Sequence, residues 1–272
     1  AAARNRSCVL AHIQPRLHLD ALIVYPSYKN YLRFLIAINS LSLNLMKKLC
    51  LLLLISAIGF AQSNFELGKK YFAEKKWELA QSNFEKVLVQ NPNNYQAIEY
   101  LGDIFGHRKQ WDLAIEKYKT LRDQFPQKAN YWYKYGGALG MKAKESSKWK
   151  ALGMIDDVEE AFLKAAELDK NHIDTRWALV MLYIELPGIV GGSEKKAQKY
   201  AAELLNLSKV DGYLAKGYID VYFKRYQSAE KNYSLAHKIG NSKITFEKLY
   251  DLYLNKLKNT EKAQQLKKEF NS

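Results

Sequence analysis

The side chains that most often carry out chemistry in proteins are scattered along this sequence. The five histidines stand apart from one another, and none belongs to an H-E-x-x-H pattern or to a cysteine–histidine metal pattern. The chain has two cysteines, Cys8 and Cys50, and no G-x-S-x-G nucleophile pattern. Neighbouring carboxylates such as Glu159 and Glu160 point in different directions on a helix, which is typical of surface charge. The sequence therefore predicts no enzyme, no cofactor and no metal site.

A glycine-rich stretch, Leu186–Ser193, precedes Lys195 and Lys196. Free backbone amides and nearby lysines can hold a phosphate in such a loop. The phosphate-binding loop, however, requires G-x-x-x-x-G-K-[ST] after a strand, and Ser193 stands where the second glycine should be. We favour a structural loop over a ligand-binding loop, with Pro187 ending one helix and Ser193 capping the next.

The elements that must position these residues follow a repeat of 34 residues. The segment from Phe65 to Asn94 recurs between Glu99 and Lys128. The matching residues are Leu67-Gly68 and Leu101-Gly102, Tyr71 and Phe105, Trp77 and Trp111, Ala80 and Ala114, Phe84 and Tyr118, and Pro92 and Pro126. This pattern resembles the tetratricopeptide repeat, whose unit is a helix-turn-helix.

The resemblance implies an all-α fold, a right-handed superhelical solenoid of antiparallel helix pairs with about five repeats plus a terminal helix pair. Gly68 and Ala80 fall where the two helices of a repeat cross and only a small side chain fits. Pro92 cannot continue a helix and ends the second one. The later units are a third repeat from Tyr131, a fourth from about Ile173 to Lys209, a fifth from Asp211 to Ile239, and terminal helices over 246–257 and 261–270.

The third repeat carries an insertion around Met141 to Asp157. It either lengthens both helices or forms a projecting loop, and we favour longer helices. Trp149 and Leu152 belong to the apolar surface that could dock the extra residues.

In tetratricopeptide repeat proteins, fixed positions of each first helix line a concave groove, and the resemblance carries these positions onto this chain. The groove residues expected to bind a ligand are Lys69, Phe72, Glu99, Asp103, Tyr133, Trp177, Met181 and Tyr218; Ile184 and Leu214 occupy further groove positions. Trp177 either forms a docking surface with Tyr133 or packs between repeats three and four.

The resemblance implies a non-catalytic scaffold that binds a protein or peptide. The Lys and Asn set with which some members hold the C-terminal carboxylate of heat-shock chaperones is absent, so a chaperone tail is not the expected partner. The alternative is a module that binds carbohydrate or cell wall through groove aromatics, as an accessory to an envelope enzyme.

The beginning of the chain has a different composition. Residues 46–61 combine Lys47 and Lys48 with an apolar run and small residues at Gly59 and Ala61, as secretory signal peptides do. We expect cleavage before Gln62, a periplasmic or secreted domain over 62–272, and an upstream segment, 1–45, that is non-native or disordered. An uncleaved N-terminal membrane anchor is the alternative, but two lysines in mid-bilayer are costly.

The formal net charge is +14. A basic balance can indicate nucleic acid or acidic membranes. Here the lysines are dispersed along the helices rather than gathered in a stripe, so we expect a solvated surface, no nucleic acid partner, and no membrane span once the signal is removed.

Overall fold

The structure is a computed structural model that describes residue 48 and residues 64–271. Residues 64–271 belong to one compact unit, Ala61–Ser272, and this unit holds the repeats. Within the described residues every regular element is a helix, and none of these helices is long and apolar enough to cross a membrane. The predictions for residues 1–45, for the signal over 46–61 and for cleavage before Gln62 lie outside the described residues.

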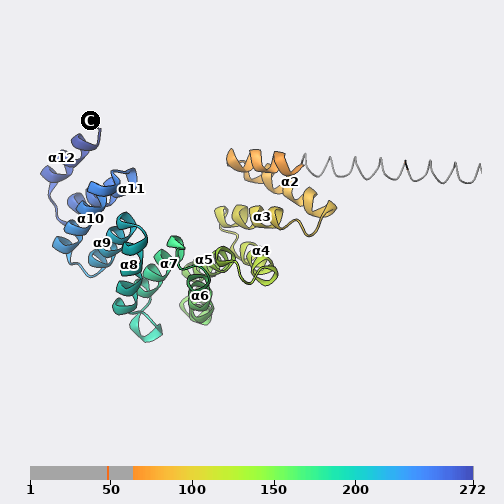
Figure 1. Ribbon diagram of the computed structural model, residues 1–272, viewed down its shortest axis with the longest axis horizontal. Coiled ribbons are helices and arrows are strands. Elements are labelled where there is room, and N and C mark those ends of the chain that lie inside the picture. The colour runs from red at the N-terminus through yellow and green to blue at the C-terminus, as the bar shows by residue number, and fades with distance from the viewer. Residues whose placement is uncertain (1–47, 49–63, 272) are drawn as a thin grey trace, which may run out of the picture. The chain divides into compact units, whose positions relative to one another are not determined.

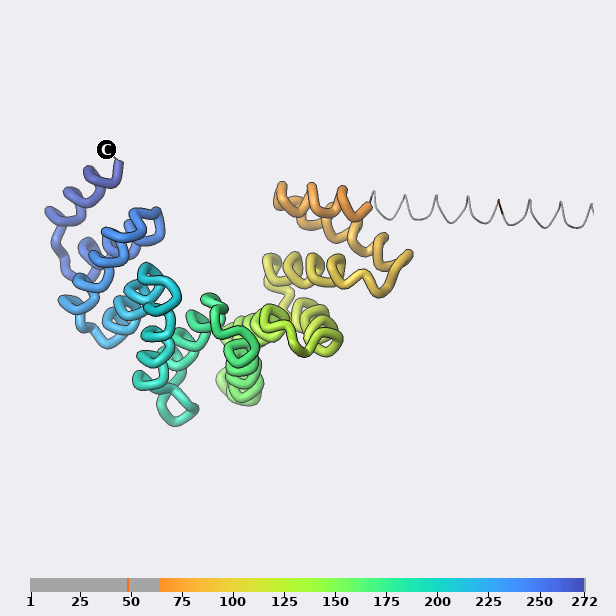
Figure 2. The backbone as a smooth tube through the Cα atoms, viewed as in Figure 1, coloured from red at the N-terminus to blue at the C-terminus, as the bar shows by residue number. Residues whose placement is uncertain are grey.

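Residues 64–271 form five helix pairs and a terminal pair, in chain order (Figure 1). The repeats are 64–73 with α2 (Trp77–Gln90), α3 (Tyr95–His107) with α4 (Trp111–Gln124), α5 (Ala129–Glu145) with α6 (Lys148–Leu168), α7 (Ile173–Glu185) with α8 (Glu194–Leu207), and α9 (Lys209–Tyr222) with α10 (Tyr226–Gly240). The terminal pair is α11 (Lys243–Asp251), extended by a π-helical turn, η3 (Leu252–Lys256), and α12 (Thr260–Asn271). Figure 2 shows the chain reversing at each turn, and the predicted solenoid of antiparallel helix pairs is confirmed.

Small residues allow the two helices of a repeat to pack closely. A methyl group on Gly102 would lie 2.6 Å from the ring of Tyr118, and one on Gly217 would lie 2.3 Å from the ring of Tyr233. Gly68 meets Phe84 in the same way, at 2.7 Å. The predicted role of a small residue at the helix crossing is confirmed.

Repeat four reverses the sizes at this crossing. Val180 precedes Tyr183 by three residues, as Gly68 precedes Tyr71, so it occupies the position of Gly217. Ala201 follows Ala197 by four residues, as Tyr233 follows Ala229, so it occupies the position of Tyr233. Val180 and Ala201 are both fully buried in one core cluster. The larger of the two side chains therefore lies on the first helix in repeat four and on the second helix in repeat five. Each repeat fills the space at the helix crossing with one larger and one smaller side chain.

The insertion in repeat three lengthens both helices, as predicted. Helix α5 has 17 residues and α6 has 21, and they meet in a short turn at Ser146 and Ser147. The expected docking of the inserted apolar residues is wrong for two of them, because Trp149 is 86% exposed and Leu152 is 42% exposed. Both side chains lie near the start of α6, in the part of the helix that the insertion adds.

The insertion in repeat four is a structural loop, as we favoured. Residues Gly188–Val190 form one 3₁₀ turn, and the amide of Ser193 donates to the carbonyl of Tyr183 at 2.8 Å. Gly191 has a φ of +99°, and a methyl group on Gly192 would lie 1.9 Å from a backbone oxygen, so both positions require glycine. The Ser193 hydroxyl accepts from the amide of Lys196, which confirms the predicted N-cap of α8.

Candidate functional site

An apolar hollow lies between the first helices α5 and α7, and we call it the α5–α7 hollow. It measures about 490 Å³ and opens between two helices that face each other across repeats three and four. Gly137 lies on its floor, and a methyl group there would meet nothing within 4 Å. Gly140, one turn further on, also adds no side chain. The hollow exists because α5 presents these glycines where a larger side chain would fill the space.

Three of the predicted groove residues line the α5–α7 hollow together. They are Tyr133, Trp177 and Met181. Met181 is 41% exposed, whereas the two aromatic residues are half-buried. An apolar side chain of a ligand can therefore lie between the thioether and the rings, and Met side chains adapt well to different apolar shapes.

Trp177 has two roles. Its indole N–H donates to the Asp211 carboxylate at 2.9 Å, which joins α7 to α9, and its ring contacts apolar residues of both repeats four and five. The same ring lines the α5–α7 hollow. The expected alternatives therefore combine: Trp177 packs against the apolar clusters that span repeats three to five, and it still offers one part of its surface to a ligand.

The rim of the α5–α7 hollow carries charged side chains. Lys144 pairs with Glu185 at 2.9 Å, and the Tyr218 hydroxyl donates to the same carboxylate at 3.0 Å. Asp174 lines the hollow, and its carboxylate makes no hydrogen bond or ion pair with any described residue. Burial and the negative charge of Asp174 raise the pKa of Tyr133. Asp174 is thus available to a cationic group of a ligand.

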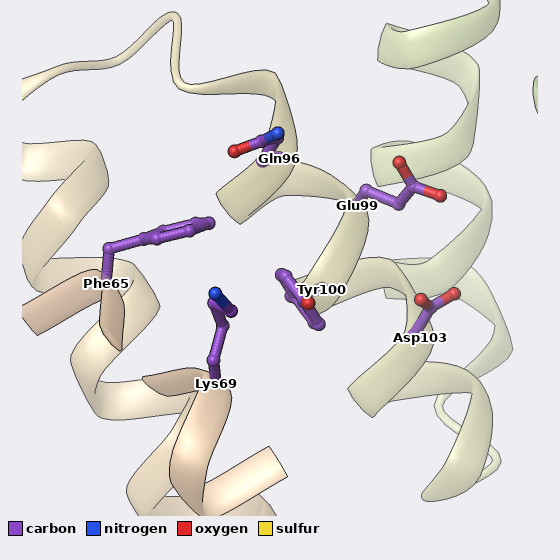
Figure 3. A pocket seen from close by; sticks show the side chains of 6 residues that line it. All are labelled: Phe65, Lys69, Gln96, Glu99, Tyr100 and Asp103. Carbon is purple, nitrogen blue, oxygen red and sulfur yellow. The ribbon is translucent and has the colours of Figure 1, made fainter. Parts of the chain in front are cut away.

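A second, more polar hollow lies between residues 64–73 and α3 (Figure 3). It contains three predicted residues, Lys69, Glu99 and Asp103, beside Phe65 and Tyr100. Lys69 pairs with Glu66 at 3.1 Å on the same helix. In Figure 3 the two carboxylates point away from the Phe65 ring.

The carboxylates of this second hollow hold α3 to α5. Lys134 of α5 binds Glu99 at 2.8 Å and Asp103 at 2.7 Å, and the Tyr118 hydroxyl donates to Asp103 at 2.6 Å. Burial alone would lower the pKa of Lys134, but the two carboxylates raise it above its ordinary value. Burial and the neighbouring Asp103 raise the pKa of Tyr118. Glu99 and Asp103 are consequently structural residues first, and they leave little capacity for a ligand.

The remaining predicted groove residues are less available. Phe72 packs edge-to-face on Trp77 and Tyr100 and belongs to the core of repeats one and two. Two further groove positions are wrong, because Ile184 is 2% and Leu214 is 7% exposed. Helix α9 covers Ile184, which shares its core cluster with residues of that helix.

Sequence reasoning missed several residues of the α5–α7 hollow, chiefly Gly140, Met141 and Glu185. The spacing Gly136-Gly137-x-x-Gly140 could have indicated an open helix face, since glycines three residues apart fall on one side of a helix. No group of three or more metal-ligating side chains is found among residues 48 and 64–271. The α5–α7 hollow offers apolar side chains and charged groups, which suit the binding of a ligand.

Comparisons with known proteins agree with this fold. A tetratricopeptide repeat protein of Thermus thermophilus matches 71% of this chain and 99% of its own, with a TM-score of 0.59 and 17% identity. The pilF protein of Pseudomonas aeruginosa matches 78% of this chain and 90% of its own, with a TM-score of 0.53 and 18% identity. A tetratricopeptide repeat protein of Parabacteroides merdae gives a TM-score of 0.55 at 13% identity, over 78% of each chain. The chain has the tetratricopeptide repeat fold.

Sequence similarity is weaker. No family model matches the chain. The general transcriptional corepressor ssn6 of Schizosaccharomyces pombe is 27% identical over 35% of this chain, and the chain covers 11% of the length of that protein. At these identities the likeness concerns the repeats themselves, and the ligand of this chain has to be inferred from its own residues.

Proposed function

We propose that this chain is a non-catalytic scaffold that binds a segment of a partner protein along its first helices. The observation that carries this proposal is the α5–α7 hollow, which combines a glycine floor with the walls Trp177 and Met181. Apolar pockets of this kind hold an anchoring side chain, and a few such anchors supply most of the affinity of an interface.

Charge indicates the chemistry of the segment. The first helices near the hollow carry Asp174, Glu185 and Asp211. Lys134 and Lys144 are the cations that line the hollow, and both are already paired with carboxylates. Of the two acids in the lining, Glu185 is paired with Lys144, whereas Asp174 forms no ion pair with a described residue. The partner segment should therefore present an apolar side chain with a lysine or arginine close to it, positioned over Asp174.

A site-specific photocrosslinker tests this proposal. Benzoylphenylalanine replaces Met181 inside the hollow and, as a matched control, Val89, which is 84% exposed on α2. Mass spectrometry of the adducts should identify one recurring peptide segment at position 181, apolar and basic, and none at position 89. Equal adducts at both positions, or adducts with glycans only, would contradict a peptide-binding scaffold. The glycan outcome would favour the carbohydrate-binding alternative.

The proposed setting is the cell envelope. The signal-like pattern of residues 46–61 supports it, since the small residues Gly59 and Ala61 fit the site that signal peptidases cut. N-terminal mass analysis of the protein from its own cells should find chains that begin at Gln62. Peptides from residues 1–45 in those cells would contradict this part of the proposal.

A further inference from the structure

Two large apolar side chains project from the turns of repeats three and four. Trp149, at the start of α6, is 86% exposed, and Ile189, in the 3₁₀ turn before α8, is 96% exposed. Both follow a first helix and precede or begin a second helix. Side chains this exposed bury little apolar area, so they contribute little to the stability of the fold. Exposed apolar side chains that share a surface often mark an interaction site.

The two turns belong to one edge of the solenoid, which we call the turn edge. It is formed by the connections from first to second helix, and ion pairs join these connections from one repeat to the next. Lys109 pairs with Glu145 at 3.5 Å between repeats two and three, and Lys144 pairs with Glu185 between repeats three and four. Arg225 continues the series with a pair at 2.7 Å to repeat four.

In the two turns that carry Trp149 and Ile189, ion pairs use every carboxylate but not every lysine. Within residues 142–153 and 185–196, the acids are Glu145, Glu185 and Glu194, and each pairs with a lysine or an arginine. Lysines without an ion pair to any described residue are Lys148, Lys150 and Lys195 in these segments, and Lys75, Lys224 and Lys258 in the turns of other repeats. The turn edge therefore has an uncompensated positive charge around its two apolar projections.

We propose that the turn edge docks on the surface of a lipid bilayer with anionic headgroups. Tryptophan prefers the interface between headgroups and acyl chains, and each lysine near an anionic surface adds electrostatic attraction. Stable attachment generally requires both an apolar and a basic signal, and the turn edge provides both. The Lys144–Glu185 pair belongs both to the turn edge and to the rim of the α5–α7 hollow, but neither Trp149 nor Ile189 lines the hollow.

A bilayer fits these observations better than a folded protein partner. Trp149 and Ile189 are prominences, so a rigid partner would need a matching pocket for each of them. A fluid interface admits both at once without a matching shape. Their lysine neighbours, Lys148 and Lys150 on either side of Trp149, are placed to reach headgroup phosphates while the ring inserts.

Vesicle co-sedimentation of the full chain tests the proposal. The vesicles contain phosphatidylcholine with or without phosphatidylglycerol. On the anionic vesicles, exchange of Lys148 and Lys150 for Glu should lower the partition coefficient by about 25-fold or more, because each lysine contributes about a fivefold factor. Trp149→Ala should lower it by about tenfold. The unmodified chain and all variants should bind neutral vesicles more weakly than anionic vesicles.

Matched controls come from the opposite edge, where second helices lead into the next repeat. Val89→Ala removes an equally exposed apolar side chain, and Lys170→Glu with Lys238→Glu removes two exposed lysines. Because these residues are remote from the docked surface and screened by salt, the control variants should partition within about twofold of the unmodified chain. Equal losses in the controls and in the turn-edge variants would overturn the proposal.

A second readout reports on Trp149 itself. Residues 46–61 could also bind lipid, but they are the same in every variant and so do not affect a comparison between variants. Lipids brominated on their acyl chains quench tryptophans that enter the bilayer. The unmodified chain should lose more fluorescence than Trp149→Phe, which keeps an apolar ring but removes the reporting indole. Equal quenching would show that Trp149 stays in water, and it would overturn the proposal even if the chain sediments with vesicles.

Discussion

Replacement of Gly217 by Ala should destabilise the protein. The new methyl carbon would lie 2.3 Å from two ring atoms of Tyr233, which is 4% exposed and cannot turn into solvent. Overpacking of a closely packed core costs about 1–3 kcal/mol, and the better helix propensity of alanine returns about 1 kcal/mol. A contact of 2.3 Å places the cost at the upper end of that range, so the expected net loss is about 2 kcal/mol, or about 4–8 °C in Tm for a domain of this size.

The control for this prediction is Gly137→Ala. Gly137 is also inside a first helix, but a methyl group there meets nothing within 4 Å. Only the gain in helix propensity applies, so Tm should rise by about 2–4 °C. Thermal melts followed by circular dichroism measure both variants. If the Tm of Gly217→Ala equals or exceeds the Tm of Gly137→Ala, α9 and α10 do not cross as closely as described.

Repeat four suggests a rescue. Because Val180 and Ala201 occupy the equivalent crossing there, Gly217→Val combined with Tyr233→Ala should restore part of the stability that each change loses alone. The coupling energy should be about 1–3 kcal/mol in favour of the double variant. Strict additivity of the two losses would mean that Gly217 and Tyr233 do not share one space.

Three further predictions concern repeat five and the terminal pair. Asp220 is 6% exposed and accepts hydrogen bonds from Arg225, Ser228 and Asn232, so Asp220→Ala should cost about 3 kcal/mol in urea unfolding, and no loss would mean that the network adds nothing. Burial lowers the pKa of His237 below its ordinary value of 6.5, against the opposing charge of Glu269, so the unfolded chain takes up a proton before the folded one. The unfolding free energy should therefore fall as pH drops below about 6.5 and level off below the folded pKa, and His237→Phe should abolish this dependence. Ser242 caps α11 in a capping box, so Ser242→Ala should cost about 1 kcal/mol and speed hydrogen exchange in α11, whereas unchanged exchange would exclude the cap as a source of stability.

The sequence predicts most of the fold because its determinants are local to each repeat. The pairing of Gly102 with Tyr118 lies within one helix pair, and the same spacing at other repeats reveals it. The N-cap at Ser193 is equally local, since its hydroxyl bonds an amide three residues away. Signals confined to one turn or one repeat are visible without knowledge of distant contacts.

The site was less predictable because it depends on how neighbouring repeats approach one another. Position counting treats all groove positions alike, yet α9 covers Ile184 while Met181, one turn earlier, stays open. Likewise, Glu99 and Asp103 have the composition of a binding surface, but Lys134 of the next repeat neutralises them. Trp149 could not be distinguished from a core residue, because its exposure follows from the length of α6.

The most direct test of the proposed scaffold compares two variants for the segment that crosslinks at position 181. Met181→Glu places a carboxylate in the α5–α7 hollow at a 41% exposed position, whereas Trp149→Ala alters only the turn edge. Isothermal titration with the synthetic segment should show at least a tenfold higher Kd for Met181→Glu and a Kd within about twofold of the unmodified chain for Trp149→Ala, with both variants folded by circular dichroism. Equal affinity in Met181→Glu and the unmodified chain would contradict binding in the hollow.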